Sequence, residues 1–105
     1  MLVATLDSEL AGSAMLAESD METRRDLTPW MTDVFVKPEF RRRKIASILV
    51  RRVVEEAREL GVGELYLFTT GAMREGLYAG LGWTVIDRPV YQHAERALMS
   101  ICPTR

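Results

Sequence analysis

The stretch 43–60 constrains the fold most, because its apolar residues recur at the spacing of an α-helix. Such a wide apolar stripe predicts a helix that packs one face against a sheet. Gly61 follows directly, which is typical of the residue after a helix end. The main residues of the stripe are Ile45, Leu49, Val53, Ala57 and Leu60.

Short β-prone runs flank this helix on both sides. The predicted strands are 2–6, 10–17, 30–36, 64–69, 83–87 and 97–101, with a loop at 18–29 and a short helix at 72–81. The two sets of alternating residues in 30–36 are both mostly apolar, so we expect this strand to be buried on both faces, especially at its end. The order predicts an α/β fold, a mixed, mostly antiparallel sheet with a central parallel strand–helix–strand crossover.

Length and composition limit the possible classes of protein. A chain of 105 residues, 48% hydrophobic, predicts a single domain over 1–105. One His and one Cys are too few for an ordinary zinc site, and no metal is implied. The lone cysteine, the absence of a secretory signal and the short apolar runs predict a soluble, cytoplasmic protein without membrane contact.

A dense basic cluster stands where the long helix begins. Residues 37–52 hold seven of the fourteen basic residues and one acid, Glu39. A helix N-terminus is already a positive pole with unpaired N–H groups, so added cations favour a bound phosphate or diphosphate. A solvated basic turn or a nucleic-acid surface would look similar, but the net charge of −1 argues against nucleic acid.

The runs VFVKPEFRRRKIASILV, ELYLFTT and LYAGLGW, in this order, resemble the GNAT N-acetyltransferase superfamily. In that family a turn of pattern Arg/Gln-x-x-Gly-x-Gly/Ala before a helix cradles the diphosphate of coenzyme A. Arg41 fits the first position and Ala46 the last, while Lys44 stands in the glycine position and Arg42 where another glycine is frequent. We expect Lys44 to weaken the backbone cradle and to offset this in part by its charge.

The resemblance implies acetyl-CoA as co-substrate, bound across two splayed strands. Backbone groups of the strand 30–36 would hold the pantetheine arm, and one N–H would stabilise an oxyanion. An ordinary buried strand would have the same sequence. The implied cofactor-binding residues are Val34, Phe35, Val36, Arg41, Arg42, Arg43, Lys44, Ile45, Ala46, Ser47 and Thr70.

Two residues are the candidate catalytic groups. The resemblance makes Tyr78 the acid that protonates the leaving thiolate, although the same residue is also typical of a core aromatic beside Leu77 and Leu81. Asp33 is the best-placed carboxylate for a general base, but it is equally typical of a strand-edge or Arg-paired acid. His93, in the loop between the last two strands, is another candidate.

Members of this family usually have a strand and two helices before the first hairpin, whereas this chain begins at the hairpin. We expect a homodimer that covers the apolar face left open. The predicted function is acetyl transfer from acetyl-CoA to a small-molecule or peptide amine by direct attack. The alternatives are a non-catalytic acyl-CoA-binding regulatory module and, less well supported, a nucleic-acid-binding protein.

Overall fold

The computed structural model describes residues 2–6, 9–18, 21–24, 26–37 and 44–103. Both long predicted elements, the strand 30–36 and the helix that follows it, are present. The elements are β1 (Leu2–Leu6), β2 (Glu9–Ala17), the 3-10 turn η1 (Glu22–Arg24), β3 (Trp30–Val36), α1 (Ile45–Glu59), β4 (Leu65–Thr69), α2 (Ala72–Gly80), β5 (Thr84–Asp87), β6 (Val90–Tyr91), β7 (Ala94–Glu95) and β8 (Ala97–Ile101).

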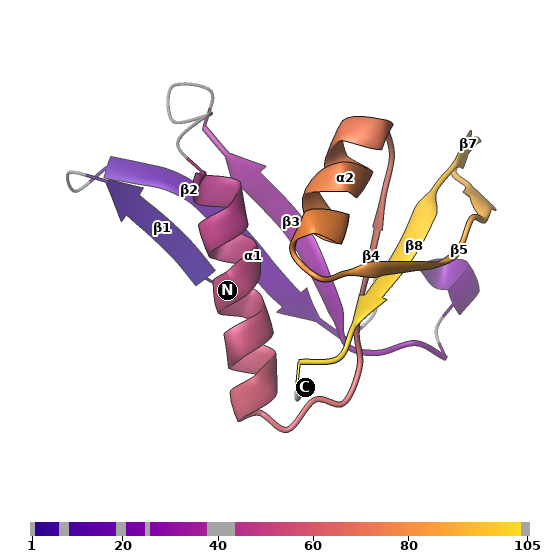
Figure 1. Cartoon of the computed structure of the whole chain (residues 1–105), viewed down its shortest axis with the longest axis horizontal. Coiled ribbons are helices and arrows are strands. Elements are labelled where there is room, and N and C mark those ends of the chain that lie inside the picture. Colours follow the sequence, from indigo (N-terminus) through magenta and orange to yellow (C-terminus); the bar gives the residue numbers. More distant parts are fainter. Residues whose placement is uncertain (1, 7–8, 19–20, 25, 38–43, 104–105) are drawn as a thin grey trace.

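Six strands form one sheet in the order β1-β2-β3-β4-β8-β5, and β6 and β7 form a separate two-stranded ribbon. β3 and β4 run parallel, and the other pairs in the sheet are antiparallel. The predicted α/β fold, with its parallel crossover inside a mostly antiparallel sheet, is therefore confirmed. The last strand, β8, lies between β4 and the edge strand β5 (Figure 1).

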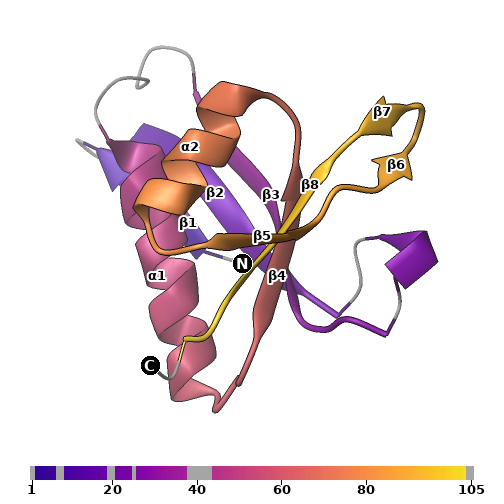
Figure 2. The ribbon, with the colours of Figure 1, turned by 45° about the vertical axis from the view of Figure 1, so that its right-hand side comes forward.

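Both helices cover the same face of the sheet, as Figures 1 and 2 show. The predicted stripe of α1 supplies much of this core, since Leu49, Val53 and Ala57 are almost fully buried. Leu60 is the exception and is 70% exposed. The helix ends at Glu59, and Leu60 is the cap residue beyond its last turn, with a φ of −82° and a ψ of 0°.

A second core lies on the opposite face, beneath the segment that precedes β3. Met21, Trp30 and Leu98 are fully buried there. The Trp30 indole donates a hydrogen bond of 2.6 Å to the carbonyl of Leu27, and its ring contacts that of Tyr66 with centroids 5.8 Å apart. The predicted loop 18–29 thus contains a 3-10 turn and covers part of the sheet with apolar side chains.

The burial of β3 differs from the prediction. Its first residues, Trp30 and Met31, are buried on opposite faces, whereas Phe35 near its end is 50% exposed. The expectation that the end would be the most buried part was therefore wrong. The physical reason is that the neighbour β4 pairs with β3 only at Trp30, so the end of β3 loses this cover.

The ribbon β6–β7 replaces a predicted loop. Gln92 and His93 form its tip with φ values of 51° and 65°, and two successive positive values are typical of a tight hairpin turn. The His93 side chain is exposed at this tip. None of the helices in the described ranges is long and apolar enough to cross a membrane.

Candidate active site between β3 and β4

The two parallel strands separate soon after they meet. Trp30 opposite Tyr66 is the one bridged pair between these two strands, both of which are fully described, and the Tyr66 N–H donates to the carbonyl of Pro29 at 3.1 Å. A bulge accentuates the separation, because Met15 lies opposite Thr32 while Ser13 lies opposite Phe35. β3 therefore has one more residue than β2 in this interval, which bends the strand at 33–34.

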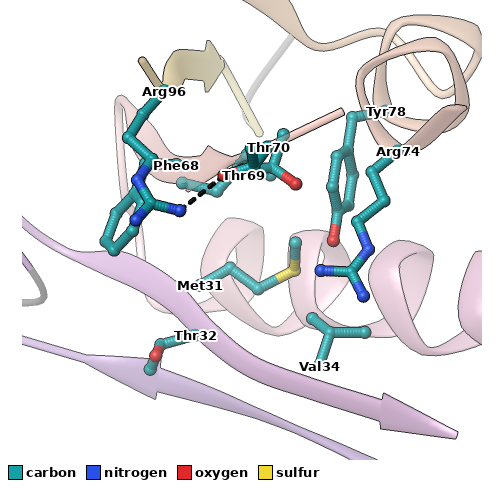
Figure 3. A pocket seen from close by; sticks show the side chains of 10 residues that line it. Met31, Thr32, Val34, Phe68, Thr69, Thr70, Arg74, Tyr78 and Arg96 are labelled. Carbon is teal, nitrogen blue, oxygen red and sulfur yellow. Dashed lines mark hydrogen bonds between the residues drawn. The ribbon is translucent and has the colours of Figure 1, made fainter. Parts of the chain in front are cut away.

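A cavity of about 290 Å³ fills the gap between β3 and β4 (Figure 3). Its side chains come from both faces of the sheet, so the cavity reaches from the helix-covered face to the opposite one. Met31, Val34, Leu67, Thr69, Arg74 and Tyr78 line it on the helix side. Thr32, Phe68, Thr70 and Arg96 line it on the other side.

Tyr78 belongs to the hydrophobic core and also lines the cavity. Its ring packs against that of Trp83 in an edge arrangement with centroids 6.1 Å apart, and the residue is only 8% exposed. Figure 3 shows its hydroxyl pointing into the cavity, beside Met31 and the guanidinium of Arg74. Burial raises the pKa of Tyr78 above its ordinary value, and the Arg74 charge opposes this rise. The phenol is therefore held protonated at neutral pH.

Arg96 forms the opposite end of the cavity. Its Nε donates to the carbonyl of Tyr91 at 2.9 Å, and one terminal nitrogen donates to Thr70 Oγ1 at 2.6 Å. The other terminal nitrogen donates to the carbonyl of Gln92 at 3.3 Å. These bonds fix the side chain against the end of β4 and the ribbon, so that the guanidinium faces the cavity (Figure 3).

The amino-terminal end of α1 is built around a strained residue. Lys44 has a φ of 59° and a ψ of 21°, the left-handed conformation that favours glycine, and its carbonyl accepts the first helical hydrogen bond from Ile48 N at 3.1 Å. The Lys44 side chain makes no capping hydrogen bond. The residue in the glycine position of the turn motif thus adopts the backbone conformation of a glycine.

The other predicted residues occupy three different settings. Val34 and Thr70 line the cavity with Tyr78, while Phe35 and Val36 lie further along β3. At the start of α1, Lys44 is exposed, Ile45 is buried in the core, and Ala46 and Ser47 are half-buried. Asp33 lies at the bulge of β3, and its side chain is outside the described part. Arg41, Arg42 and Arg43 also lie outside the described residues.

The prediction from sequence missed Arg74 and Arg96. Arg74 precedes Tyr78 by four residues, so helical spacing alone places the two side chains on one face of α2. Arg96 has no comparable local signal, because its partner Thr70 is 26 residues away and belongs to another part of the sheet.

The sequence model described as "Acetyltransferase (GNAT) family" matches residues 1–83 of the chain. The chain belongs to the GNAT acetyltransferase family. This confirms the resemblance inferred from the turn motif and from the run LYAGLGW. A search of the curated proteins found no significant match.

Solved structures of GNAT proteins share the fold. YncA from Salmonella typhimurium, solved with its cofactor acetyl-CoA, matches with a TM-score of 0.80 at 18% identity, over 98% of this chain and 64% of that one. The ribosomal-protein-S18-alanine N-acetyltransferase of Escherichia coli matches with a TM-score of 0.77 at 18% identity, over 96% of this chain and 66% of that one. A Bacillus subtilis acetyltransferase in complex with CoA matches with a TM-score of 0.76 at 16% identity, over 95% of this chain and 74% of that one. The chain thus spans about two thirds of the length of the first two.

Proposed function

We propose that this GNAT protein is an acetyl-CoA-dependent N-acetyltransferase that moves an acetyl group to an amine acceptor. Family membership supports acetyl transfer in general. The observation that carries the proposal for this chain is the cavity between β3 and β4, with the Tyr78 hydroxyl pointing into it (Figure 3). Acetyl-CoA supplies the activated acetyl group as a thioester.

The arrangement of the elements fits such a co-substrate. β3 and β4 are parallel, so α1 and α2, which follow them, both begin at the same edge of the sheet. A phosphate group at the start of α1 would meet backbone N–H groups that the Lys44 side chain does not cap, together with the amine of Lys44. Ile45, Ala46 and Ser47 would contribute these N–H groups, and the adjoining Arg41, Arg42 and Arg43 further charge.

The gap between the strands would take the pantetheine arm, with the thioester reaching the cavity. Val34, Phe35 and Val36 would present backbone groups along this path, and Thr70 stands at the end of the neighbouring strand. Trp30 and Tyr66 form the one bridged pair between β3 and β4, so the two strands do not continue as a paired ladder beyond it. An extended ligand arm would lie between the separated strands.

Tyr78 would act as the general acid. As the amine nitrogen bonds to the thioester carbonyl carbon and the bond from that carbon to sulfur breaks, Tyr78 would give its hydroxyl proton to the sulfur. A thiol has a pKa of about 8.5 and a tyrosine of about 10, so this transfer is moderately uphill. Burial raises the pKa of Tyr78 further and makes this transfer more uphill, and the Arg74 charge limits the rise.

The acceptor must lose a proton to become the final amide, so a base is needed as well. We propose Asp33 for this role, directly or through water, because it belongs to the bulged part of β3 that borders the cavity. His93 is less suited, because it lies at the tip of the β6–β7 ribbon and is not among the residues that line the cavity. The acceptor would be a small-molecule or peptide amine.

Binding and turnover test the proposal separately. A ligand at about 100 times its Kd adds roughly 2.7 kcal/mol of stability, so acetyl-CoA and CoA should raise the melting temperature while duplex DNA should not. Release of free thiol from acetyl-CoA in the presence of an amine panel then tests catalysis. Stabilisation without thiol release would instead favour an acyl-CoA-binding regulatory module, and no stabilisation would contradict both.

We also propose that the protein is a homodimer. Several large apolar side chains are exposed, among them Met73 at 90% and Leu77 at 36% on one face of α2. Exposed apolar surface of this kind is often buried by association. Light scattering after size-exclusion chromatography should give twice the mass of the chain, and a monomer mass at all concentrations would refute the dimer.

A further inference from the structure

Arg96 is a fixed cation whose bonding partners are all neutral. Its guanidinium donates to two backbone carbonyls, those of Tyr91 and Gln92, and to the hydroxyl oxygen Oγ1 of Thr70. Its own backbone N–H donates to the carbonyl of Pro89 at 2.8 Å. The side chain is half-buried and its orientation is set from three sides. None of these acceptors offsets its positive charge.

Three of the described arginines have carboxylate partners, whereas Arg51, Arg58 and Arg74, like Arg96, have none among the described residues. Arg24 pairs with Asp26 and Asp87, Arg52 with Glu55, and Arg88 with Glu75. Arg96 forms no ion pair with any described residue.

The described side chains that line the cavity include two guanidiniums, from Arg74 and Arg96, and no carboxylate. A guanidinium has five N–H donors, of which Arg96 uses three, so two remain for a ligand.

The two cations lie at opposite ends of the site. Arg74 stands beside the Tyr78 hydroxyl on the helix side, where the leaving sulfur would receive its proton (Figure 3). Arg96 lies on the other side of the sheet with Phe68 and Thr70. The thioester would enter along the gap from the start of α1, on the face of the sheet that the helices cover. The acceptor would then approach from the other face, where Arg96 is a charged group in its path.

We propose that Arg96 binds a carboxylate of the acceptor, so that the acceptor class is a small amine with a carboxylate group, such as a free amino acid. This inference rests on the proposed acetyltransferase function. A guanidinium binds a carboxylate through two parallel charge-assisted hydrogen bonds, which a neutral amide cannot match. Binding the carboxylate at this end would direct the amine of the same molecule toward the middle of the cavity.

Arg96 also has a structural effect, because its bonds tie the ribbon to the end of β4, and the experiment has to separate the two effects. Each L-amino acid is therefore compared with its own amide as acceptor, in the wild type and in Arg96→Gln, Arg96→Lys and Arg58→Gln. Arg58 is exposed in the last turn of α1 and does not line the cavity, so its variant controls for the lost charge. Within each acceptor the ratio of variant to wild type cancels differences in amine basicity.

The wild type should have a higher kcat/KM for the amino acids than for their amides. Arg96→Gln should lower kcat/KM for amino acids by about 10- to 100-fold while changing it for the amides less than about threefold, since one charge-assisted pair is lost. Arg96→Lys should recover part of the loss, and Arg58→Gln should behave as the wild type. An equal loss for acids and amides would mean that Arg96 is only structural, and efficient turnover of amines without a carboxylate would also overturn the proposal.

A binding measurement distinguishes a failure of this inference from a failure of the proposed function. Calorimetric titration with N-acetyl amino acids and their amides, in the presence of CoA, requires no turnover. Acids that bind the wild type at least tenfold more tightly than Arg96→Gln would support the carboxylate site even in a protein without catalysis. Absence of acetyl-CoA binding would contradict the proposed function, whereas bound acetyl-CoA with no preference for acids would contradict this inference alone.

Discussion

Replacing Lys44 by glycine should make the protein more stable, although it removes the side chain at the start of its longest helix. Lys44 has a φ of 59°, where a side chain clashes with the backbone, and this strain lowers the stability of the folded state by about 1–2 kcal/mol. Glycine relieves this strain but has more conformational freedom in the unfolded chain, which offsets about 0.5–1 kcal/mol. The net gain should be about 1 kcal/mol, or a rise of about 4 °C in melting temperature.

Lys44→Ala is the matched control, because alanine also lacks the amine but keeps the clash at positive φ. The Lys44 side chain is exposed and makes no cap, so the alanine variant should stay within about 0.5 kcal/mol of the wild type. Urea unfolding of the three proteins gives these differences from the transition midpoints. A glycine variant no more stable than the alanine variant would refute the strain argument.

The same three proteins separate the two effects of Lys44 on the co-substrate. If the amine contacts the diphosphate, Lys44→Ala should weaken CoA binding by about tenfold, the loss of one charge-assisted bond. Lys44→Gly should bind more tightly than Lys44→Ala, because the backbone can then approach the phosphate more closely. Equal affinities of all three for CoA, measured by calorimetry, would show that this turn does not hold the diphosphate.

Three further predictions concern Tyr78 and the glycines. Tyr78→Phe should lower kcat about 10²-fold or more and leave the Kd for acetyl-CoA nearly unchanged, and an unchanged rate would remove Tyr78 from the mechanism. Burial raises the pKa of Tyr78 in the folded state, so its contribution to stability is complete below about pH 10 and is lost as the pH rises through the higher folded value. Tyr78→Phe should therefore reduce the alkaline loss of stability seen in unfolding measurements, and an identical alkaline profile would contradict the assigned burial. Gly12→Ala should destabilise the protein by about 1–3 kcal/mol, because the new Cβ would lie 2.5 Å from the Phe35 carbonyl oxygen. Gly76 lies in the middle of α2 and a Cβ there would meet no atom within 4 Å, so Gly76→Ala should stabilise the protein by about 0.5–1 kcal/mol. A Gly12→Ala variant as stable as the wild type would show that β2 and β3 are not so close.

Local patterns in the chain determine its main elements. The spacing from Ile45 to Ala57 forces one helix face to be apolar, and this face is buried on the sheet as predicted. The run LYLFT alternates between the two faces as β4, with Leu65 and Leu67 in the core below the helices. These features depend on periodicity over a few residues, which any fold that buries apolar surface has to satisfy.

The site depends on contacts between residues distant in the chain. Nothing near Trp30 indicates that β3 leaves β4 after one pair, nor that its far end, with Phe35, is the exposed one. The ribbon around His93 was expected to be a loop, because two-residue strands are too short for an alternating pattern.

By itself the sequence determined the helices, the succession of the main strands along the chain and the family, because these follow from local spacing and from a motif read along the chain. Only the tertiary structure decided which charged groups share the cavity. Arg96 meets Thr70 because β8 lies beside β4, and Arg74 reaches the same cavity from α2 (Figure 3). Strand order and the bulge in β3 are global properties, set by how all the apolar faces are buried together.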